Sequence, residues 1–315
     1  MIDLYRECAS IVNQVPKGMV TTYGAVARAL GDDIAKRAVG VMLNTYGPPI
    51  KMPCHRVVYS GGGLGGFGLG LPRKIEMLAD EGVKVKDDKI YNFENIFFDK
   101  FKTTYPLRKA RKEQLRLTEE LDLRKPKKAH DLVLGLDASY IGTRAFAAGV
   151  LYSVKEKRQV KLFTAENKIN WPYVPTYLGF REIPAFGPII EELKGDAVLM
   201  LDGNGILHPF GFGIASHIGV VQGMPSVGAA KTLLCGKPAG IPSKLGASQP
   251  VILGKRRIGA ALRTSERGKP IYVSPGHLMD METAVRLTRS VSRLRIPEPL
   301  RLAHAEATEM RRSKA

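Results

Sequence analysis

The apolar positions between residues 130 and 231 fall into short runs that predict a β-sheet. DLVLGLDASY and FAAGVLYSV flank a small-residue turn and predict a β-hairpin, and VKLFTAENKI supplies a third strand. GDAVLMLDGNG then predicts a buried strand ending at Asp202, followed by a helix around FGIASHIGVVQG and a short strand in MPSVGAAK. Strands that alternate with helices indicate an α/β domain.

Residues 1 to 98 show a different pattern, in which short helical stretches surround a glycine-rich segment, GGGLGGFGLG. TYGAVARALG and IAKRAVGVMLN are separated by a break at two aspartates, which predicts helix, turn and helix. Such a pair can place its second helix against DNA. A further helix, PRKIEMLADEG, is expected to end at Gly82.

The stretch from Tyr105 to His130 separates the two patterns. It contains almost no bulky apolar residues except leucines at roughly helical spacing, which predicts a linker passing into a charged helix. That helix has either a solvated face or a direct contact with DNA. Because the length of the chain leaves room for two domains, we expect a first domain at 1–100, a basic linker and leading helix at 101–129, and a second domain at 130–315.

The charge of the chain points to a polyanionic partner. Lysine and arginine number 48 against 30 acidic residues, giving a formal net charge of +18 and a pI near 9.8. We expect no membrane partner and a cytoplasmic location, because the sequence has no long uncharged apolar run and no signal-peptide pattern. The 3 cysteines are too widely spaced for a disulfide framework or a CxxC zinc site.

The first candidate for chemistry is Cys54, in the run MPCHRVV. A thiol needs a neighbouring base or cation to react at neutral pH, and His55 is adjacent in sequence. Consecutive residues on a strand point to opposite faces, so a contact between the two requires a turn, which Pro53 favours. From the residues alone, a reactive thiol and a small buried apolar side chain are equally good interpretations.

Three carboxylates form the second candidate. Asp137 ends the apolar run LVLGL, Asp202 ends AVLML, and Glu182 lies in FREIPAF at the start of a helix. If the two strands are neighbours, their aspartates converge at one sheet edge, where like charges need a cation. Oxygen ligands suit Mg²⁺ or Mn²⁺, which positions a water and neutralises a scissile phosphate. Strand-end aspartates also serve as turn or capping residues.

The sequence motifs around Cys54 resemble those of a known family. VPKGMVTTYGAVARALG, KRAVGVMLN, MPCHRVV and LPRKIEMLADEG together resemble the C-terminal domain of O6-alkylguanine-DNA alkyltransferases, over nearly all of residues 1 to 95. The resemblance implies a small domain with a helix-turn-helix and no cofactor. It also implies that Cys54 attacks the alkyl carbon on guanine O6 and keeps the alkyl group as a thioether, so that one protein repairs one base.

The resemblance assigns roles to four further residues. His55 takes the thiol proton through a water, and Glu81 orients and charges that imidazole, which is the logic of a base-activated nucleophile. Tyr23 hydrogen-bonds guanine N3, and Arg37 takes the place of the flipped nucleotide in the stack. An insertion residue is needed because the target atom is out of reach inside the duplex.

One departure from the family pattern concerns an asparagine that usually stands eight residues before the cysteine. That position is Tyr46 here, and Asn44 lies two residues farther away. The alternative is therefore a binding module that senses alkylated bases without dealkylating them. The presence of Cys54 favours chemistry.

The second half resembles endonuclease V over residues 130 to about 300. The resemblance rests on GLDASY, WPYVPTYLGFREIPAF, LMLDGNGILHPFGFGIASHIG, SVGAAKTLLCG and VSPGHLMD, which occur in the family's order. It implies a ribonuclease-H-like mixed sheet and hydrolysis of a phosphodiester on the 3′ side of a deaminated base, chiefly hypoxanthine, with uracil and xanthine as further substrates.

The same resemblance implies that Asp137, Asp202 and Glu182 hold Mg²⁺ or Mn²⁺. His277 would be the fourth member of the site, orienting water or metal. Lys231 in GAAK would contact the phosphate, where a fixed positive charge stabilises the developing anion.

In PYVP, Tyr173 corresponds to the wedge residue, an aromatic side chain that enters the duplex and stacks on a base. We place Trp171 in the core.

Together these features predict a fused repair protein that combines α/β and α+β domains: a small alkyltransferase domain with a helix-turn-helix, followed by a ribonuclease-H-like domain. Its expected partner is double-stranded DNA with alkylated or deaminated bases, and the protein is expected to be a monomer. Single-stranded DNA and RNA are alternative substrates, because sensing a 2′-hydroxyl depends on contacts that the sequence does not reveal.

Overall fold

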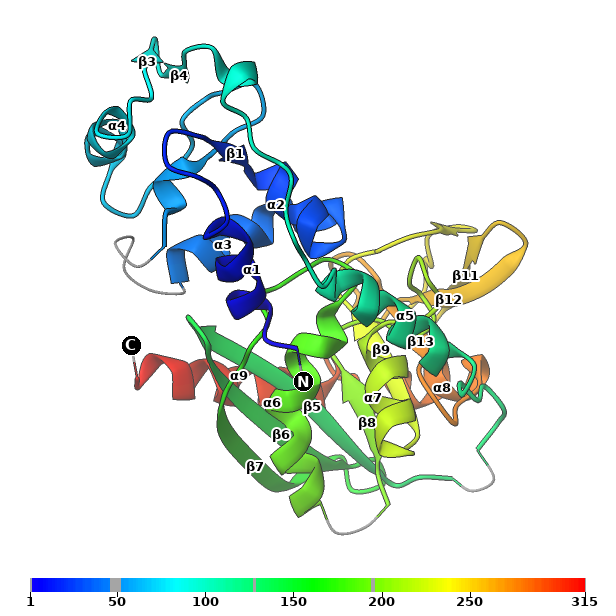
Figure 1. Ribbon diagram of the computed structural model, residues 1–315. Helices are drawn as coiled ribbons and strands as arrows, with labels where there is room; N and C mark the ends of the chain where they lie inside the picture. Colours follow the sequence, from blue (N-terminus) through cyan, green and yellow to red (C-terminus); the bar gives the residue numbers. More distant parts are fainter. Residues whose placement is uncertain (1, 46–51, 127–128, 194–195, 315) are drawn as a thin grey trace. The chain divides into compact units, whose positions relative to one another are not determined.

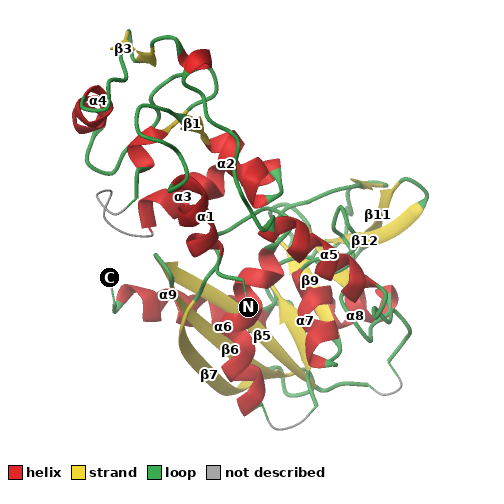
Figure 2. Ribbon diagram, in the orientation of Figure 1, coloured by secondary structure: helices red, strands yellow, loops and turns green. Residues whose placement is uncertain are grey.

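A computed structural model describes the chain, and its description covers residues 2–45, 52–126, 129–193 and 196–314. The chain forms two compact units (Figure 1). The first comprises Met1–Arg111 with Asn170–Pro175, and the second Lys112–Ile169 with Thr176–Ala315. Helices and loops make up most of the first unit, whereas the second is built on a large sheet (Figure 2).

The first unit begins with a group of helices. α2 ends at Gly31, whose φ of 110° is a left-handed value that favours glycine. A short 3₁₀ turn then leads into the next helix, so the predicted helix-turn-helix is confirmed. The elements are α1 (Leu4–Val12), α2 (Tyr23–Leu30), η1 (Asp33–Ala35) and α3 (Lys36–Thr45).

The rest of the first unit has short elements around a small apolar core. β1 pairs in parallel with β2, which follows the cysteine turn, and the core side chains come from both sides of the glycine-rich segment. The elements are β1 (Thr21–Thr22), η3 (Cys54–Arg56), β2 (Val57–Val58), α4 (Leu71–Ala79), β3 (Val85–Lys86), β4 (Lys89–Ile90) and η4 (Phe93–Asn95).

The charged stretch expected to link the domains contains the helix α5 (Pro106–Thr118). It is not only a solvated face. Leu107 is fully buried, and the amide of Gln114 donates a hydrogen bond to the carbonyl of Phe212 over 2.8 Å. The division between the two units falls inside this helix, after Arg111.

The second unit has a nine-stranded mixed sheet with the order β10-β11-β12-β13-β9-β8-β5-β6-β7. The expected hairpin and third strand are the antiparallel β5, β6 and β7. β8 runs parallel to β5, and β9 runs parallel to β8. The strands are β5 (Leu132–Ile141), β6 (Arg144–Ser153), β7 (Arg158–Lys168), β8 (Val198–Leu201), β9 (Ser226–Ala230), β10 (Lys237–Pro238), β11 (Ser248–Leu253), β12 (Arg256–Leu262) and β13 (Ile271–Pro275).

Helices cover both faces of this sheet (Figure 1). Neighbouring residues of a strand point to opposite faces. Leu134 therefore packs with α6 (Leu178–Glu192) and α7 (Ile214–Gln222), and Val133 packs on the side of α8 (Met281–Ser290) and α9 (Glu298–Arg312). This layered mixed sheet agrees with the predicted fold class.

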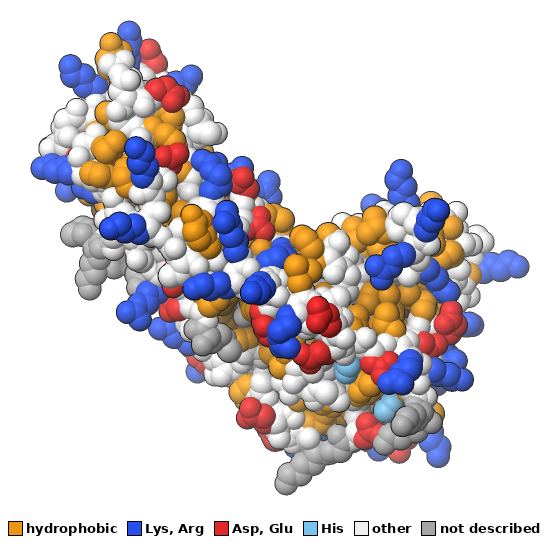
Figure 3. Space-filling model, turned by 45° about the vertical axis from the view of Figure 1, so that its right-hand side comes forward, with side chains coloured by type: hydrophobic (Ala, Val, Ile, Leu, Met, Phe, Trp, Pro, Cys, Tyr) orange, Lys and Arg blue, Asp and Glu red, His pale blue; other side chains and the backbone are white. Residues whose placement is uncertain are grey.

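α9 lies very close to β5. A Cβ at Gly135 would stand 2.4 Å from the backbone of Pro299, so only glycine permits this approach. Among the described residues, no helix has the length and apolar character needed to span a membrane. Lysine and arginine side chains are spread over the face seen in Figure 3, as expected for a net charge of +18.

Two candidate active sites

Cys54 opens the 3₁₀ turn η3 and is almost fully buried. This turn, which Pro53 precedes, removes the strand alternation that would have separated the thiol from His55. Cys54 lines a cavity of 1140 Å³. Tyr23 and Arg37, both predicted site residues, line the same cavity. The first unit therefore brings the expected nucleophile and the expected DNA-contacting residues to one hollow.

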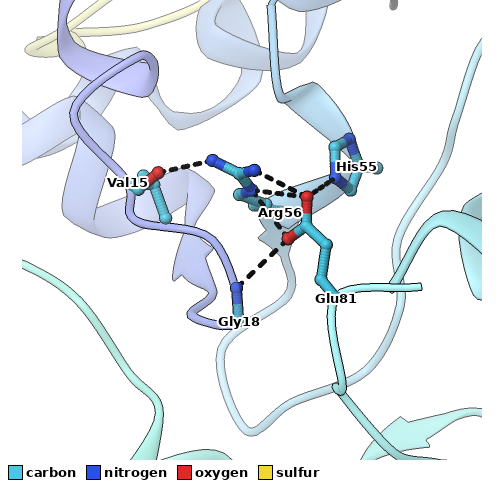
Figure 4. Close-up of polar contacts among 5 residues, drawn as sticks. All are labelled: Val15, Gly18, His55, Arg56 and Glu81. Atoms are coloured by element: carbon cyan, nitrogen blue, oxygen red, sulfur yellow. Dashed lines mark hydrogen bonds and ion pairs between the residues drawn. The ribbon is translucent and has the colours of Figure 1, made fainter. Parts of the chain in front are cut away.

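Glu81 is the hub of a polar network behind the cysteine turn (Figure 4). Its Oε1 lies 2.9 Å from His55 Nε2, and the Arg56 guanidinium donates to both carboxylate oxygens over 2.6 to 3.1 Å. The amide of Gly18 donates to Oε2 over 3.3 Å, and Arg56 Nη1 also donates to the carbonyl of Val15 over 2.7 Å. The expected pairing of the base with an orienting carboxylate is present.

The network fixes the charges of its members. Burial raises the pKa of Glu81, but the hydrogen bonds from Arg56, His55 and Gly18 outweigh it and bring the pKa down to about 2. Burial lowers the pKa of His55, against the opposing effect of Glu81. His55 Nδ1 is buried and has no hydrogen-bond partner within the described ranges of the chain. A neutral imidazole held at Nε2 thus has a free ring nitrogen that can accept a proton.

Lys74 is a member of this site that the sequence did not reveal. It is fully buried in α4, and its Nζ donates to the carbonyls of Val57 and Leu64 over 2.7 and 2.5 Å. Burial lowers its pKa to about 8. Burial raises the pKa of the Cys54 thiol, whereas the charge of Lys74 lowers it. A lysine in the run LPRKIEM gives no signal of burial, because its neighbours are charged too.

The glycine-rich segment packs on Tyr23. The tyrosine hydroxyl lies 3.4 Å from the carbonyl of Gly66, to which it donates. A Cβ on Gly65, whose φ is +69°, would come within 3.2 Å of that hydroxyl. The ring centroid of Tyr59 lies 5.6 Å from that of Tyr23. The segment is therefore a wall of the cavity that needs glycine at this contact.

The departure from the alkyltransferase pattern concerns residues near the end of α3. Asn44 lies in this helix and lines the cavity of Cys54. Tyr46, at the position where the family pattern has asparagine, lies outside the described residues. Arg37 is exposed on the same helix, as an insertion residue requires.

The second unit brings the three predicted carboxylates together. Residue 136 on β5 pairs with residue 201 on the adjacent, parallel β8. Asp137 and Asp202 each come directly after one residue of this pair, so they lie at neighbouring positions on the two strands. Burial raises the pKa of Asp137, and the charge of Asp202 adds to the effect. Burial raises the pKa of Glu182 to about 8, with a further contribution from the charge of Asp137. The expected convergence of like charges is present.

Each aspartate has a cationic or imidazole partner. His304 Nδ1 lies 2.6 Å from Asp137 Oδ2, and Lys231 Nζ forms a close ion pair with Asp202. In the part of the chain that the structure describes, no group of three His, Cys, Asp or Glu side chains is close enough to hold a metal ion. The oxygen donors and their mutual repulsion suit a hard divalent cation. To bind one, the aspartates must turn from these partners.

Two family models match the chain, and they divide it. "Endonuclease V" matches residues 114–305, and "6-O-methylguanine DNA methyltransferase, DNA binding domain" matches residues 3–83. A bifunctional methyltransferase/endonuclease from Picrophilus torridus is 33% identical over 99% of this chain and 98% of its own length. One from Thermoplasma volcanium is 34% identical over 96% of this chain and 88% of its own length. The chain belongs to the bifunctional methyltransferase/endonuclease family.

Solved structures resemble the endonuclease half of this bifunctional methyltransferase/endonuclease. Endonuclease V from Streptomyces avermitilis is 32% identical, covers 66% of this chain and 94% of its own, and has a TM-score of 0.62. Ciona intestinalis endonuclease V, solved with DNA containing an inosine followed by a ribo-adenosine, is 25% identical over 68% of this chain and 100% of its own, with a TM-score of 0.60.

An imidazole that the sequence did not predict contacts an aspartate of the acidic site of the bifunctional methyltransferase/endonuclease. His277 Nδ1 accepts from the amide of Asp122 over 3.2 Å, and the amide of His277 donates to Ser226 Oγ over 2.9 Å. The histidine that contacts Asp137 is His304 on α9. Sequence reasoning missed it because a histidine in the run LRLAHAEA looks like any exposed helical residue until α9 is placed over β5.

The predicted wedge residue, Tyr173, has 55% of its surface exposed. Trp171 is buried, as expected, with 1% of its surface exposed. Both residues belong to the first compact unit, although the family model for endonuclease V includes their positions.

Proposed function

We propose that this bifunctional methyltransferase/endonuclease moves an alkyl group from guanine O6 to Cys54, and cleaves a phosphodiester on the 3′ side of a deaminated base in DNA. The network of His55, Glu81 and Arg56 behind the thiol carries the first half of the proposal. The three mutually repelling carboxylates carry the second. Double-stranded DNA is the proposed substrate of both sites.

In the first reaction, the thiol proton passes to His55 Nδ1 through a water, because this is the ring nitrogen without a partner in the described chain. Glu81 at Nε2 stabilises the imidazolium that forms. The Cys54 sulfur then bonds to the alkyl carbon, the bond from carbon to O6 breaks, and its electron pair stays on the guanine. Tyr23 donates a hydrogen bond to the base as its charge develops. A thioether does not hydrolyse, so each protein acts once.

In the second reaction, Asp137, Asp202 and Glu182 would hold Mg²⁺ or Mn²⁺, which when bound supplies an activated water and offsets the charge of the phosphate. His304 holds Asp137 through its hydrogen bond until that carboxylate turns to the cation. Lys231 is placed beside Asp202 and can move to the phosphate once that carboxylate is engaged elsewhere. Tyr173 fills the space left by the extruded base.

One experiment tests each half. The protein is incubated without metal with a duplex carrying one O6-methylguanine, and the peptide containing Cys54 is weighed. A methyl mass that is absent in Cys54→Ser supports alkyl transfer, and an unmodified peptide despite binding would make this half a lesion sensor. With Mg²⁺, cleavage of matched deoxyinosine and inosine strands, with Asp202→Asn as control, separates a DNA nuclease from an RNA nuclease.

A further inference from the structure

The segment Asn170–Pro175 belongs to one half of the protein by sequence and to the other by structure. It lies inside the range 114–305 that matches endonuclease V, yet it packs as part of the first compact unit. The residues on both sides of it along the chain belong to the second unit. The alkyltransferase half therefore holds a segment that carries the proposed wedge residue of the nuclease.

Two hydrogen bonds attach this segment to the beginning of the chain. Trp171 Nε1 donates to the carbonyl of Ile2 over 2.8 Å, and the amide of Leu4 donates to the carbonyl of Asn170 over 2.9 Å. Leu4 is the first residue of α1 and is fully buried. The segment is thus attached to a helix that contributes to the core of the first unit.

Burial alternates sharply within the segment. Trp171 and Val174 each have 1% of their surface exposed, whereas Tyr173 between them has 55%. Pro172 and Pro175 restrict the backbone on either side, because the ring of proline fixes φ. A tyrosine ring is therefore presented to solvent from a backbone that is restricted by prolines and held by two buried side chains.

We infer that Trp171 is a positioning residue for the nuclease: held by the N-terminal residues of the alkyltransferase unit, it fixes Tyr173 in the place from which the ring enters the duplex. This inference rests on the proposed function of Tyr173 as the wedge. It makes duplex cleavage depend on an anchor that the nuclease half does not itself contain.

The dependence has a physical signature. Extruding a base from a duplex costs unstacking and unpairing energy, whereas a base in a single strand needs no such opening. An aromatic side chain that is already ordered loses little conformational entropy when it inserts, so loosening it raises the cost of opening. Loss of the anchor should therefore slow cleavage of a duplex and spare a single strand.

The test is Trp171→Phe in the full-length protein, which keeps an aromatic ring in the core and removes the N–H that bonds Ile2. We expect cleavage at deoxyinosine in a duplex to fall about fivefold, as for one lost hydrogen bond. Cleavage of the same strand without its complement should change less than about twofold, and alkyl uptake by Cys54 should be unchanged. Pro175→Gly, which relaxes the backbone without removing a fully buried side chain, should give the same duplex-selective loss.

Three controls decide the outcome. Ile11→Val removes a buried methyl group from α1 and should leave the ratio of duplex to single-strand cleavage unchanged. Tyr173→Ala should lower duplex cleavage more than Trp171→Phe, and the double variant should be no worse than Tyr173→Ala, since both changes act through one ring. Equal losses on both substrates, no loss at all, or additive losses in the double variant would overturn the positioning role. A Tyr173→Ala protein with full duplex cleavage would instead refute the wedge proposal itself.

Discussion

Glu81 and Glu182 are two shielded glutamates of the same chain, and their pKa values are about 2 and about 8. Burial raises both values. Glu81 faces Arg56 and His55, whose hydrogen bonds reverse the effect, whereas Glu182 faces the like charge of Asp137, which adds to it. Burial is the largest contribution at both sites, and the sign of the neighbouring charge decides whether that contribution is reversed or reinforced.

The contrast matches what each site has to do. In the alkyltransferase site, the carboxylate of Glu81 is paired with the side chains of Arg56 and His55. The nuclease site gathers carboxylates whose repulsion is only partly offset by His304 and Lys231. The remaining negative charge of this site is what the proposed cation would neutralise.

The largest effects should separate the two sites completely. Cys54→Ser should abolish alkyl uptake and leave cleavage at deoxyinosine intact. Asp202→Asn should lower cleavage by at least about a thousandfold, since a metal-ligand charge is lost, and leave alkyl uptake intact. EDTA should reproduce the second result without any substitution. Mass spectrometry of the Cys54 peptide and gel-based cleavage assays measure both, and loss of alkyl uptake in EDTA would contradict the contrast.

Replacing each glutamate by glutamine should give opposite effects on stability. Glu81→Gln leaves the Arg56 guanidinium without its counter-charge and should cost the first unit about 3–5 kcal/mol. It should also slow alkyl uptake about a hundredfold, because the imidazolium loses its partner. Glu182→Gln removes a repelling charge and should leave the metal-free second unit equally or more stable at pH 8, while cleavage is lost.

The free energy of unfolding of each unit is measured by hydrogen exchange in increasing concentrations of denaturant, because exchange reports the two units separately. Glu76→Gln on the exposed face of α4 is the matched control for the first unit, because its carboxylate pairs with the exposed Arg73. If Glu81→Gln and Glu182→Gln destabilise their units to the same degree, the environments of the two glutamates do not differ as described.

The pH dependence of stability should also have opposite signs. The folded pKa of Glu81 lies below its unfolded value of 4.5, so its contribution is present above pH 4.5 and is lost as the pH falls towards 2. The folded pKa of Glu182 is raised, so without metal the second unit should lose stability as the pH rises from 4.5 to 8. The change amounts to at most about 3 kcal/mol for Glu81 and at most about 5 kcal/mol for Glu182. Glu182→Gln should remove the second slope, and its persistence in that variant would assign the slope to another group.

The sequence was sufficient to predict a residue's role wherever that role follows from a short local motif or from a position at the end of a strand. The run MPCHRVV placed the thiol beside a base, and Asp137 and Asp202 were expected together because both end apolar strands. It was insufficient where a side chain gains its role from distant packing. Lys74 is recognisable only when α4 lies on the cysteine turn, and His304 only when α9 crosses β5.

The segment around Trp171 shows the same limit for domain organisation. Its motif assigns it to the nuclease, and nothing local to it predicts a hydrogen bond to Ile2, which is far away in sequence. The division of the units within α5 likewise depends on which buried partners each turn of the helix finds. Composition marked the region as charged but does not contain that information.

The smallest expected effect concerns Lys74, a cation whose charge acts on the Cys54 thiol. Its charge lowers the pKa of Cys54 against the larger effect of burial, so Lys74→Met should move the pH profile of thiol alkylation by iodoacetamide to higher pH. At pH 7 the rate should fall about tenfold. Arg73→Met, which removes an exposed positive charge from the same helix, should change the rate less than about twofold.

Cys8 adds little background to this measurement, because burial raises its pKa to about 12, and the signal that remains in Cys54→Ser can be subtracted. Lys74 also bonds the carbonyls of Val57 and Leu64, so its loss can slow the reaction by loosening the cavity wall. The two causes differ in form. A lost charge shifts the pH profile and leaves its plateau at high pH unchanged, whereas a loosened wall lowers the plateau at every pH. A lowered plateau without a shift would mean that Lys74 acts through the geometry of the cavity wall and not through its charge.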